Sequence, residues 1–189
     1  MKTSYLFLAQ GFEEIEALTV VDVMRRAGMP LKTVSITENN TVVGAHAIPV
    51  VADMTIAEAD LSDAEWLIAP GGMPGSTNLA ECKTLTDALQ QHNTKNGKIA
   101  AICAAPAVVL APLGILNGKE ATCYPGFECK GAIMRETPVV ALENIITANG
   151  PATALLFALA IVANSLGEAA AKEIGNGMLL YPKNFEFYF

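Results

Sequence analysis

The sequence has few charged residues, and the charge it carries is mostly negative. Charged side chains make up 16% of the 189 residues, and the formal net charge is −7. Binding to nucleic acid depends on clusters of lysine and arginine that meet phosphates, and no such cluster occurs in this sequence. The negative charge also opposes adsorption to anionic membrane surfaces. We therefore expect neither a nucleic acid nor a membrane among its partners.

Long apolar runs are also missing. The longest apolar stretch covers residues 152–163, which is shorter than the roughly 20 residues that a membrane-spanning helix needs. Near the N-terminus, the apolar run at residues 5–9 is too short to form the core of a signal peptide. These absences predict a protein that stays in the cytoplasm.

Cysteine and histidine are scarce, and their spacing excludes the common metal sites. There are four cysteines and two histidines, with no Cys-x-x-Cys pair and no histidine at a zinc-site spacing from one. The reducing cytoplasm keeps cysteines as thiols rather than disulfides. We therefore expect free thiols and no metal. The residues concerned are Cys82, Cys103, Cys123, Cys129, His46 and His92.

The sequence does contain a regular alternation of strand-like and helix-like segments. Apolar residues make up 52% of the chain, and the strand-like segments are continuous apolar runs, as is typical of strands covered by helices on both faces. This pattern predicts a doubly wound α/β fold with a mostly parallel sheet, in one domain over residues 1–189. The predicted strands are 5–9, 32–36, 66–69, 99–102, 139–142 and 145–147, with a hairpin at 42–51, and the predicted helices are 14–27, 79–95, 105–113, 151–166 and 169–179.

Functional groups of such folds gather where strands end and helices begin, and Cys103 occupies one of these turns. Alanines flank it, so the chain can make the tight corner of a nucleophile elbow, with sulfur in place of oxygen. We expect the N-terminus of the following helix to lower the pKa of this thiol. The alternative is a small buried residue in an alanine-rich core, which is how most free cysteines occur. Position alone leaves both interpretations open.

Two further turns lie at the same edge of the predicted sheet. Gly71 and Gly72 follow the strand at 66–69, and without side chains they let the backbone approach a ligand or direct N–H groups at an anion. The alternative for these glycines is an ordinary tight turn. The turn after the first strand leads into Glu13 and Glu14, which we interpret as acidic residues that only favour the start of a helix.

Glu16 differs from these two glutamates because it falls on the apolar side of the first predicted helix. At 100° per residue it lies among Val20, Val23 and Ala27. A carboxyl group in that position must find a partner or stay protonated. It also comes to the sheet edge where Cys103 is expected, so a neutral Glu16 could donate a hydrogen bond to a thiolate.

Five segments resemble one known family. They are Gly11-Phe-Glu-Glu-Ile-Glu-Ala, Val21-Asp-Val-Met-Arg-Arg-Ala-Gly, Pro70-Gly-Gly, Ala100-Ala-Ile-Cys-Ala-Ala-Pro and Asn149-Gly-Pro-Ala-Thr. In this order, over nearly the whole chain, they resemble the ThiJ/PfpI superfamily, in the branch of the Parkinson-disease-linked protein deglycase (DJ-one). The resemblance implies a flavodoxin-like sheet with helices on both faces, a homodimer, and a protein that works without a metal or an organic cofactor.

The resemblance also implies roles for individual residues. The elbow cysteine of the family corresponds to Cys103, its protonated glutamate to Glu16, and its oxyanion-type N–H groups to Gly72 and Ala104. Gly71 belongs to the same expected pocket.

Two positions depart from the family pattern. Tyr124 stands before Pro125 where many relatives have a histidine, and tyrosine, with an ordinary pKa of about 10, is a poor base at neutral pH. His46 stands where the closest branch has an arginine, and it is either a replacement base or an exposed residue of the hairpin. The other histidine, His92, is expected on the surface of a helix.

Together these inferences favour an enzyme. Cys103 would act on small reactive dicarbonyls such as glyoxal or methylglyoxal, or on their adducts, as a glyoxalase III-like or deglycase-like lyase or hydrolase. The alternative is a redox-sensing stress protein or chaperone in which Cys103 is oxidised. A cysteine peptidase or amidotransferase-like hydrolase is disfavoured by Tyr124, and a role in thiamine-precursor (thiazole monophosphate) biosynthesis has no supporting residue. The aromatic segment 185–189 is expected to be buried against the protein body or a partner.

Overall fold

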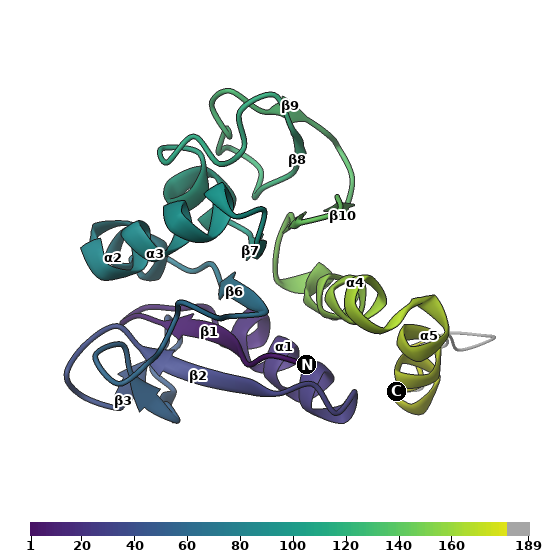
Figure 1. Ribbon diagram of the computed structural model, residues 1–189, viewed down its shortest axis with the longest axis horizontal. Helices are drawn as coiled ribbons and strands as arrows, with labels where there is room; N and C mark the ends of the chain where they lie inside the picture. The colour runs from purple at the N-terminus through teal and green to yellow at the C-terminus, as the bar shows by residue number, and fades with distance from the viewer. Residues whose placement is uncertain (181–189) are drawn as a thin grey trace, which may run out of the picture.

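The computed structural model describes residues 1–180, and a seven-stranded sheet runs through its centre (Figure 1). Its strands are β1 (Ser4–Leu8), β2 (Leu31–Ser35), β5 (Met54–Thr55), β6 (Trp66–Ala69), β7 (Lys98–Ile102), β10 (Val139–Ala141) and β11 (Ile145–Ala148). Their order in space is β10-β11-β7-β6-β1-β2-β5. All neighbouring pairs are parallel except β10 and β11. The predicted mostly parallel sheet is confirmed.

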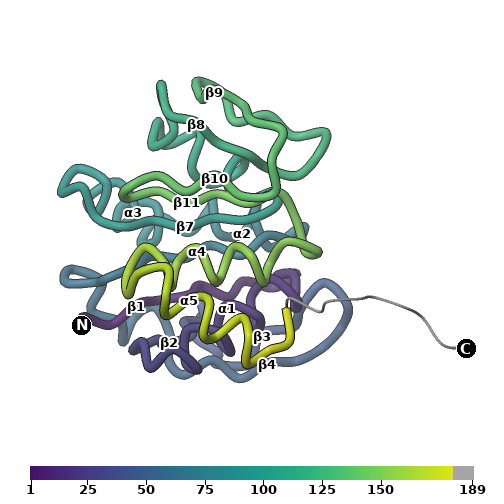
Figure 2. Tube along the Cα trace, turned by 90° about the vertical axis from the view of Figure 1, so that its right-hand side faces the viewer, coloured from purple at the N-terminus to yellow at the C-terminus, as the bar shows by residue number. Residues whose placement is uncertain are grey.

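Helices cover both faces of the sheet (Figure 2). One layer contains α1 (Glu14–Arg26), α4 (Ala154–Leu166) and α5 (Glu168–Gly177), and the other contains α2 (Gly75–Glu81), α3 (Lys83–Thr94) and the short helix η1 (Pro106–Leu110). Alternate side chains of β1 enter the two layers, Leu6 on the α1 side and Phe7 on the α3 side. The predicted flavodoxin-like, doubly wound α/β fold is therefore confirmed, and the continuous apolar strands are explained by burial on both faces.

The helix predicted at 105–113 has a different form. Only Pro106–Leu110 is helical, as a π-helix in which the N–H of Ala111 donates to the carbonyl of Pro106 at 2.9 Å, and turns follow it. The segment that follows Cys103 is thus a helix of five residues. The dipole of an α-helix grows from many aligned peptide groups, so this short segment supplies little of it.

The remaining differences from the predicted elements are small. The segment 79–95 forms two helices rather than one, because Cys82 between them is extended, with φ −74° and ψ 98°. The predicted hairpin is confirmed as β3 (Thr41–Val43) and β4 (Pro49–Val51), and Pro151 opens a 3-10 turn, η2 (Pro151–Thr153), before α4. The short strands β8 (Glu120–Ala121) and β9 (Ile133–Met134), and β5, were missed because two residues are too few to show a period.

His92 was predicted on a helix surface, and this prediction is wrong. The residue is 8% exposed, near the end of α3. Its ring packs on Gly97, where an added Cβ would come within 2.4 Å of Nε2. Burial lowers the pKa of His92. The glycine that follows α3 makes room for the ring, which a single-helix wheel does not reveal.

Two expectations about apolar segments have different outcomes. Within residues 1–180, every helix is too short or too polar to cross a membrane. The aromatic segment 185–189 lies outside the described residues, so its burial stays a prediction.

Candidate active site

Cys103 follows β7 directly, at the carboxyl edge of the sheet. Its φ is +65°, a backbone conformation that residues with side chains rarely adopt. The main chain holds it on both sides, because its N–H donates to Ala148 at 2.9 Å and its carbonyl accepts from the N–H of Tyr124 at 2.8 Å. Such strain persists only where the surrounding structure fixes it, and it is common at functional sites. The sequence placed Cys103 in a tight corner, and the structure has that corner.

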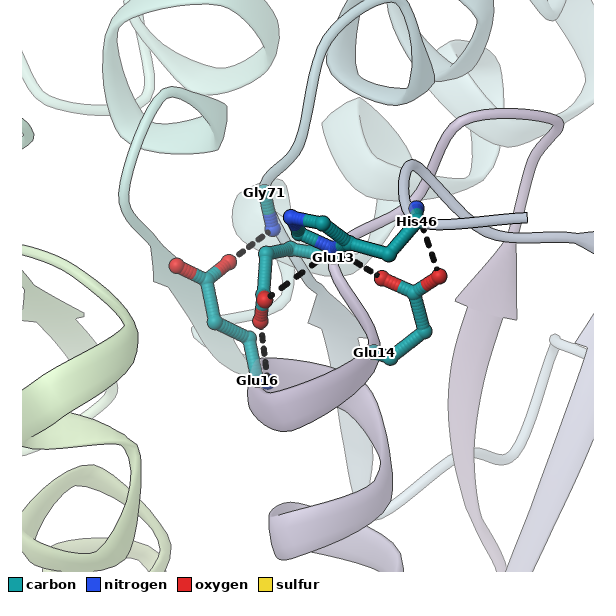
Figure 3. A network of polar contacts seen from close by, with 5 residues as sticks. All are labelled: Glu13, Glu14, Glu16, His46 and Gly71. Carbon is teal, nitrogen blue, oxygen red and sulfur yellow. Dashed lines mark hydrogen bonds and ion pairs between the residues drawn. The ribbon is translucent and has the colours of Figure 1, made fainter. Parts of the chain in front are cut away.

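Glu16 projects from α1 toward Gly71, in the turn after β6 (Figure 3). Its side chain is fully buried, and Oε2 accepts a hydrogen bond from the N–H of Gly71 at 2.7 Å. The Cys103 thiol lies within hydrogen-bonding reach of the same carboxyl group. Among residues 1–180, no donor of ordinary geometry meets the other oxygen, Oε1.

Gly71 is the residue around which this pair meets. A Cβ at Gly71 would lie 2.5 Å from Cβ of Cys103 and 2.6 Å from Oε2 of Glu16. These distances are far below van der Waals contact, so any side chain at this position would push the carboxyl group and the thiol apart. The structure thus explains why the residue that donates to Glu16 is a glycine.

The carboxyl group of Glu16 is far less acidic than an ordinary glutamate. Burial raises its pKa to about 7, while hydrogen bonds with Cys103 and Gly71 act in the opposite direction. Burial dominates because removing a carboxylate from water costs more free energy than hydrogen bonds from one N–H and one thiol recover. Glu16 can therefore be neutral at a pH where ordinary glutamates are ionised.

Cys103 does not show the lowered pKa that we expected from its position before a helix. Burial, followed by the charge and hydrogen bond of Glu16, raises the pKa of Cys103 to about 12. The N–H groups of Gly72 and Ala104 hydrogen bond to the sulfur and act in the opposite direction. The expectation was wrong because burial and the facing Glu16 together outweigh the N–H groups at this turn.

The two acids face each other, so they lose their protons in turn. The first proton leaves near pH 7, and the negative charge that remains, shared by Glu16 and Cys103, delays loss of the second proton to about pH 12. Between about pH 7 and about pH 12 the site therefore holds one proton and one negative charge between a sulfur and a carboxyl group. This is the electrostatic arrangement that a nucleophile with its own proton carrier requires.

The start of α1 holds a second polar cluster, which the sequence did not reveal (Figure 3). Glu14 is buried, and its two oxygens accept from the main-chain N–H and interact with Nδ1 of His46, each at 2.8 Å. Glu13 caps the helix by accepting from the N–H of Glu16 at 2.8 Å. Glu13 thus favours the start of the helix, as predicted, whereas the prediction is wrong for Glu14, whose carboxyl group also binds His46. The glycine at position 44 is a trace of this contact in the sequence, because a Cβ there would lie against the Glu14 carboxyl group.

The Glu14–His46 pair shifts both pKa values toward the charged forms. Burial acts to raise the pKa of Glu14, but hydrogen bonds from His46 outweigh it and the pKa is lowered. The hydrogen bond with Glu14 raises the pKa of His46, whose ring is exposed on the hairpin turn as predicted. Because this ring is paired with Glu14, the structure does not place it as a base for Cys103.

Among residues 1–180, the same cluster is also spaced so that it could hold a cation. Glu13, Glu14 and His46 each offer a ligand atom, and these atoms lie within 4.8 Å of one another. His46 already satisfies Glu14, so the geometry is accounted for by the protein alone.

Tyr124 contacts the site through its backbone. Its N–H holds the carbonyl of Cys103, while its half-exposed ring lies near Gly150 and lines a pocket of about 560 Å³. Cys123, Arg135 and Asn149 line the same pocket, and Cys103 does not. The ring of Tyr124 therefore shares this pocket with Cys123 rather than with Cys103.

Comparison with known proteins gives four findings. The profile of the DJ-1/PfpI family matches residues 2–164. Protein DJ-1 homolog B of Arabidopsis thaliana is 33% identical over 186 residues, 96% of this chain and 42% of that protein, so the chain spans less than half of this relative. The glutathione-independent glyoxalase DJR-1.2 of Caenorhabditis elegans is 36% identical over 154 residues, 79% of this chain and 81% of that protein. The solved structure of oxidized Toxoplasma gondii DJ-1 is 33% identical, with a TM-score of 0.89 over 96% of this chain and 100% of that one.

Proposed function

The chain belongs to the DJ-1/PfpI family, and from that membership and the site we propose that it consumes small reactive dicarbonyls or their adducts through Cys103. The reaction would be glyoxalase III-like or deglycase-like and would need no cofactor. The observation that carries the proposal is the contact between a buried glutamate of pKa about 7 and a thiol held in a strained corner. The similarity to a glutathione-independent glyoxalase supports the same class of reaction.

We place the single negative charge of the pair on sulfur. The N–H groups of Gly72 and Ala104 interact with Sγ of Cys103, and a neutral Glu16 would add its carboxylic acid as a third donor. In the opposite arrangement, an ionised Glu16 accepts only from Gly71 and the thiol. A charged acceptor is favoured where more donors meet it.

The first chemical step is addition. The thiolate of Cys103 attacks the aldehyde carbon of methylglyoxal or glyoxal, a C–S bond forms, and the carbonyl π electrons move to oxygen. Glu16 then protonates this oxygen to give a hemithioacetal and becomes a carboxylate. The N–H groups near the sulfur help to hold the developing negative charge.

In the second step Glu16 acts as a base. Its carboxylate removes the proton from the hemithioacetal carbon and returns it to the neighbouring carbon, which gives a 2-hydroxyacyl thioester. Water then hydrolyses the thioester to lactate or glycolate and restores the thiol. A glutamate with a pKa near 7 suits both directions of transfer at neutral pH. Early amine or thiol adducts release free dicarbonyl, so the same cysteine also consumes them.

The test is formation of lactate from methylglyoxal in the absence of glutathione. The native protein is expected to form it, and Cys103→Ala to form none while keeping its fold, because the corner tolerates a small side chain. Cys82→Ala is the matched control, since Cys82 lies half-buried between α2 and α3. Full activity of Cys103→Ala would overturn the proposal.

A redox-sensing role for Cys103 is the second candidate. The N–H groups of Gly72 and Ala104 and a neutral Glu16 surround the sulfur, and such donors would also hold the oxygens of a sulfinate. The similarity to a DJ-1 structure in an oxidized form favours this candidate. Native protein that forms no lactate, but gains two oxygens at Cys103 before any other cysteine, would support sensing rather than catalysis.

We further propose that the protein is a cytoplasmic homodimer. Large apolar side chains are exposed on α1 and on the neighbouring hairpin, among them Ile15, Leu18 and Ile48. Their proximity follows from the Glu14–His46 pair that joins the two elements. Light scattering at micromolar concentration is expected to give the dimer mass, and Leu18→Lys to lower it; a monomer mass for the native protein would refute this.

A further inference from the structure

Two more thiols face each other on the opposite side of the sheet from Glu16. Cys123 and Cys129 lie in the segment between β8 and β9, and both are buried in the layer that contains α3. The sulfur of Cys123 lies close enough to the thiol and the main-chain N–H of Cys129 for both to lower its pKa. The Cys123 thiol in turn donates to the carbonyl of Phe127 at 3.4 Å.

The backbone between these cysteines is folded into consecutive turns that bring their sulfur atoms together. The N–H of Phe127 donates to Tyr124 at 3.1 Å, and the N–H of Ala132 donates to Cys129 at 3.0 Å. Gly126 has a φ of +91°, which permits the sharp reversal. The two thiols interact directly across this turn, which is the starting arrangement that a disulfide requires.

The two thiols differ in access to small molecules. Cys123 lines the pocket of about 560 Å³ beside Tyr124 and Arg135, whereas Cys129 does not line it and is 1% exposed. Their contact also shifts their pKa values in opposite directions. The interaction with the Cys129 thiol lowers the pKa of Cys123, and the same interaction raises the pKa of Cys129. A reagent in the pocket therefore meets the more acidic thiol first.

From this juxtaposition we propose that Cys123 and Cys129 form a second redox site, in which a peroxide converts the facing thiols into an intramolecular disulfide. Cys123 is the attacking thiol and Cys129 the resolving one. The site is separate from the Cys103–Glu16 pair and does not depend on the proposed dicarbonyl chemistry.

The chemistry balances with the peroxide as the oxidant. The Cys123 sulfur attacks one peroxide oxygen, an S–O bond forms, the O–O bond breaks, and the leaving oxygen departs as water after taking a proton. The Cys129 sulfur then attacks the sulfenic sulfur, an S–S bond forms, the S–O bond breaks, and the hydroxide leaves as water with the Cys129 proton. Two thiols and hydrogen peroxide thus become one disulfide and two waters.

The simpler explanation is that the two cysteines are small apolar residues that fill the core. That explanation accounts for their burial, but it predicts no preferred partner and no order of reaction. The experiment therefore asks whether peroxide oxidises these two thiols together.

The test uses Cys103→Ala, which removes the elbow thiol and leaves three cysteines of the four. After treatment with hydrogen peroxide, two of the three free thiols are expected to be lost, the intact mass to fall by two hydrogen atoms, and dithiothreitol to reverse both changes. Cleavage after Glu128 separates Cys123 from Cys129, so the disulfide is expected to join two fragments. This mapping can also be done with all native cysteines present.

Three variants in the Cys103→Ala background establish the order of events. Cys129→Ser is expected to trap Cys123 as a sulfenic acid that dimedone labels, and Cys123→Ser to leave Cys129 unreacted. Cys82→Ser is the control and is expected to form the disulfide as before.

Three results would overturn the proposal: retention of all three thiols at peroxide concentrations that oxidise Cys103 in the native protein, a disulfide between two chains, or a product that gains oxygen without joining the fragments. Circular dichroism of each variant shows whether it is folded. If a serine variant is unfolded, the fragment mapping of the native protein tests whether the disulfide forms.

Discussion

Glu14 and Glu16 lie two residues apart on one turn of α1, and both are buried, yet their acidities shift in opposite directions. Glu14 accepts two hydrogen bonds from His46 at the edge of the protein, and its pKa is lowered. Glu16 accepts one main-chain N–H and faces a thiol, and burial raises its pKa to about 7. The number of donors and the depth of burial, rather than residue type or position on a helix, decide which glutamate can carry a proton at neutral pH.

The largest expected effect separates the two glutamates by activity. Glu16→Gln removes a proton carrier but keeps the shape of the side chain, and positioned acid–base groups contribute about 10² to 10⁴ in rate. We expect lactate formation to fall by that factor, and Glu14→Gln to change it only a few-fold. Initial rates with methylglyoxal measure both. Equal losses in the two variants would contradict the assignment of the proton carrier to Glu16.

A second effect concerns the thiolate of Cys103. If a neutral Glu16 donates to the thiolate, this hydrogen bond stabilises the thiolate by about 1.5–3 kcal/mol. Since one pKa unit is about 1.4 kcal/mol, Glu16→Leu should raise the pH at which the thiolate appears by about one to two units. Glu16→Gln keeps a donor and should raise it less, and Glu14→Gln should leave it unchanged.

Thiolate absorbance against pH measures this midpoint in each protein. If Glu16 is instead ionised beside a neutral thiol, Glu16→Gln removes a negative charge and the midpoint falls. A fall would reject the neutral donor while leaving Cys103 as the nucleophile.

Each glutamate also has a glycine packed against it, which allows a matched pair of substitutions. A Cβ at Gly71 would lie 2.6 Å from Oε2 of Glu16, and a Cβ at Gly44 would lie 2.3 Å from Oε1 of Glu14. Overpacking of this kind typically costs about 1–3 kcal/mol. We expect both alanine variants to be destabilised in urea, but only Gly71→Ala to lose lactate formation as well. Loss of activity in Gly44→Ala alone would reverse the roles of the two clusters.

The smallest expected effects are opposite slopes of stability with pH. The folded pKa of Glu16 is raised from 4.5 to about 7, so its contribution is complete below pH 4.5 and is lost as pH rises through 7. The folded pKa of Glu14 is lowered, so its contribution is present above pH 4.5 and is lost as pH falls through the folded pKa. We expect Glu16→Gln to remove a decline in Tm between pH 4.5 and 7.

His46 narrows the pH range in which the Glu14–His46 pair stabilises the protein. Its folded pKa is raised, so its contribution is complete below its ordinary value of 6.5 and is lost as pH rises through the folded pKa. His46→Gln should therefore lower Tm most between pH 4.5 and 6.5 and least at alkaline pH. A deficit that does not vary with pH would show that the ring acts by packing alone.

Much of the fold could be predicted because its signals are local. β6 appears in the sequence with its observed bounds, since four apolar residues run directly into Pro70-Gly71-Gly72. Glu16 could be found for the same reason, because a helical period of 3.6 residues places its side chain among valines. The corner at Cys103 follows from small neighbours between a buried strand and a proline. Each of these inferences needs only residues within one or two turns of chain.

The sequence by itself determined most of the order of strands and helices along the chain, the two-sided burial of the sheet, and the presence of a carboxyl group and a thiol at one edge. Only the tertiary structure decided their electrostatics. Glu14 meets His46 across 32 positions of sequence, and Glu16 meets Gly71 across 55. The pKa of Cys103 rises rather than falls because burial and a facing acid act together there. Solvent exclusion and charge–charge interactions depend on which segments come together in three dimensions. The periodicity of residues along the chain does not indicate the distances between such segments.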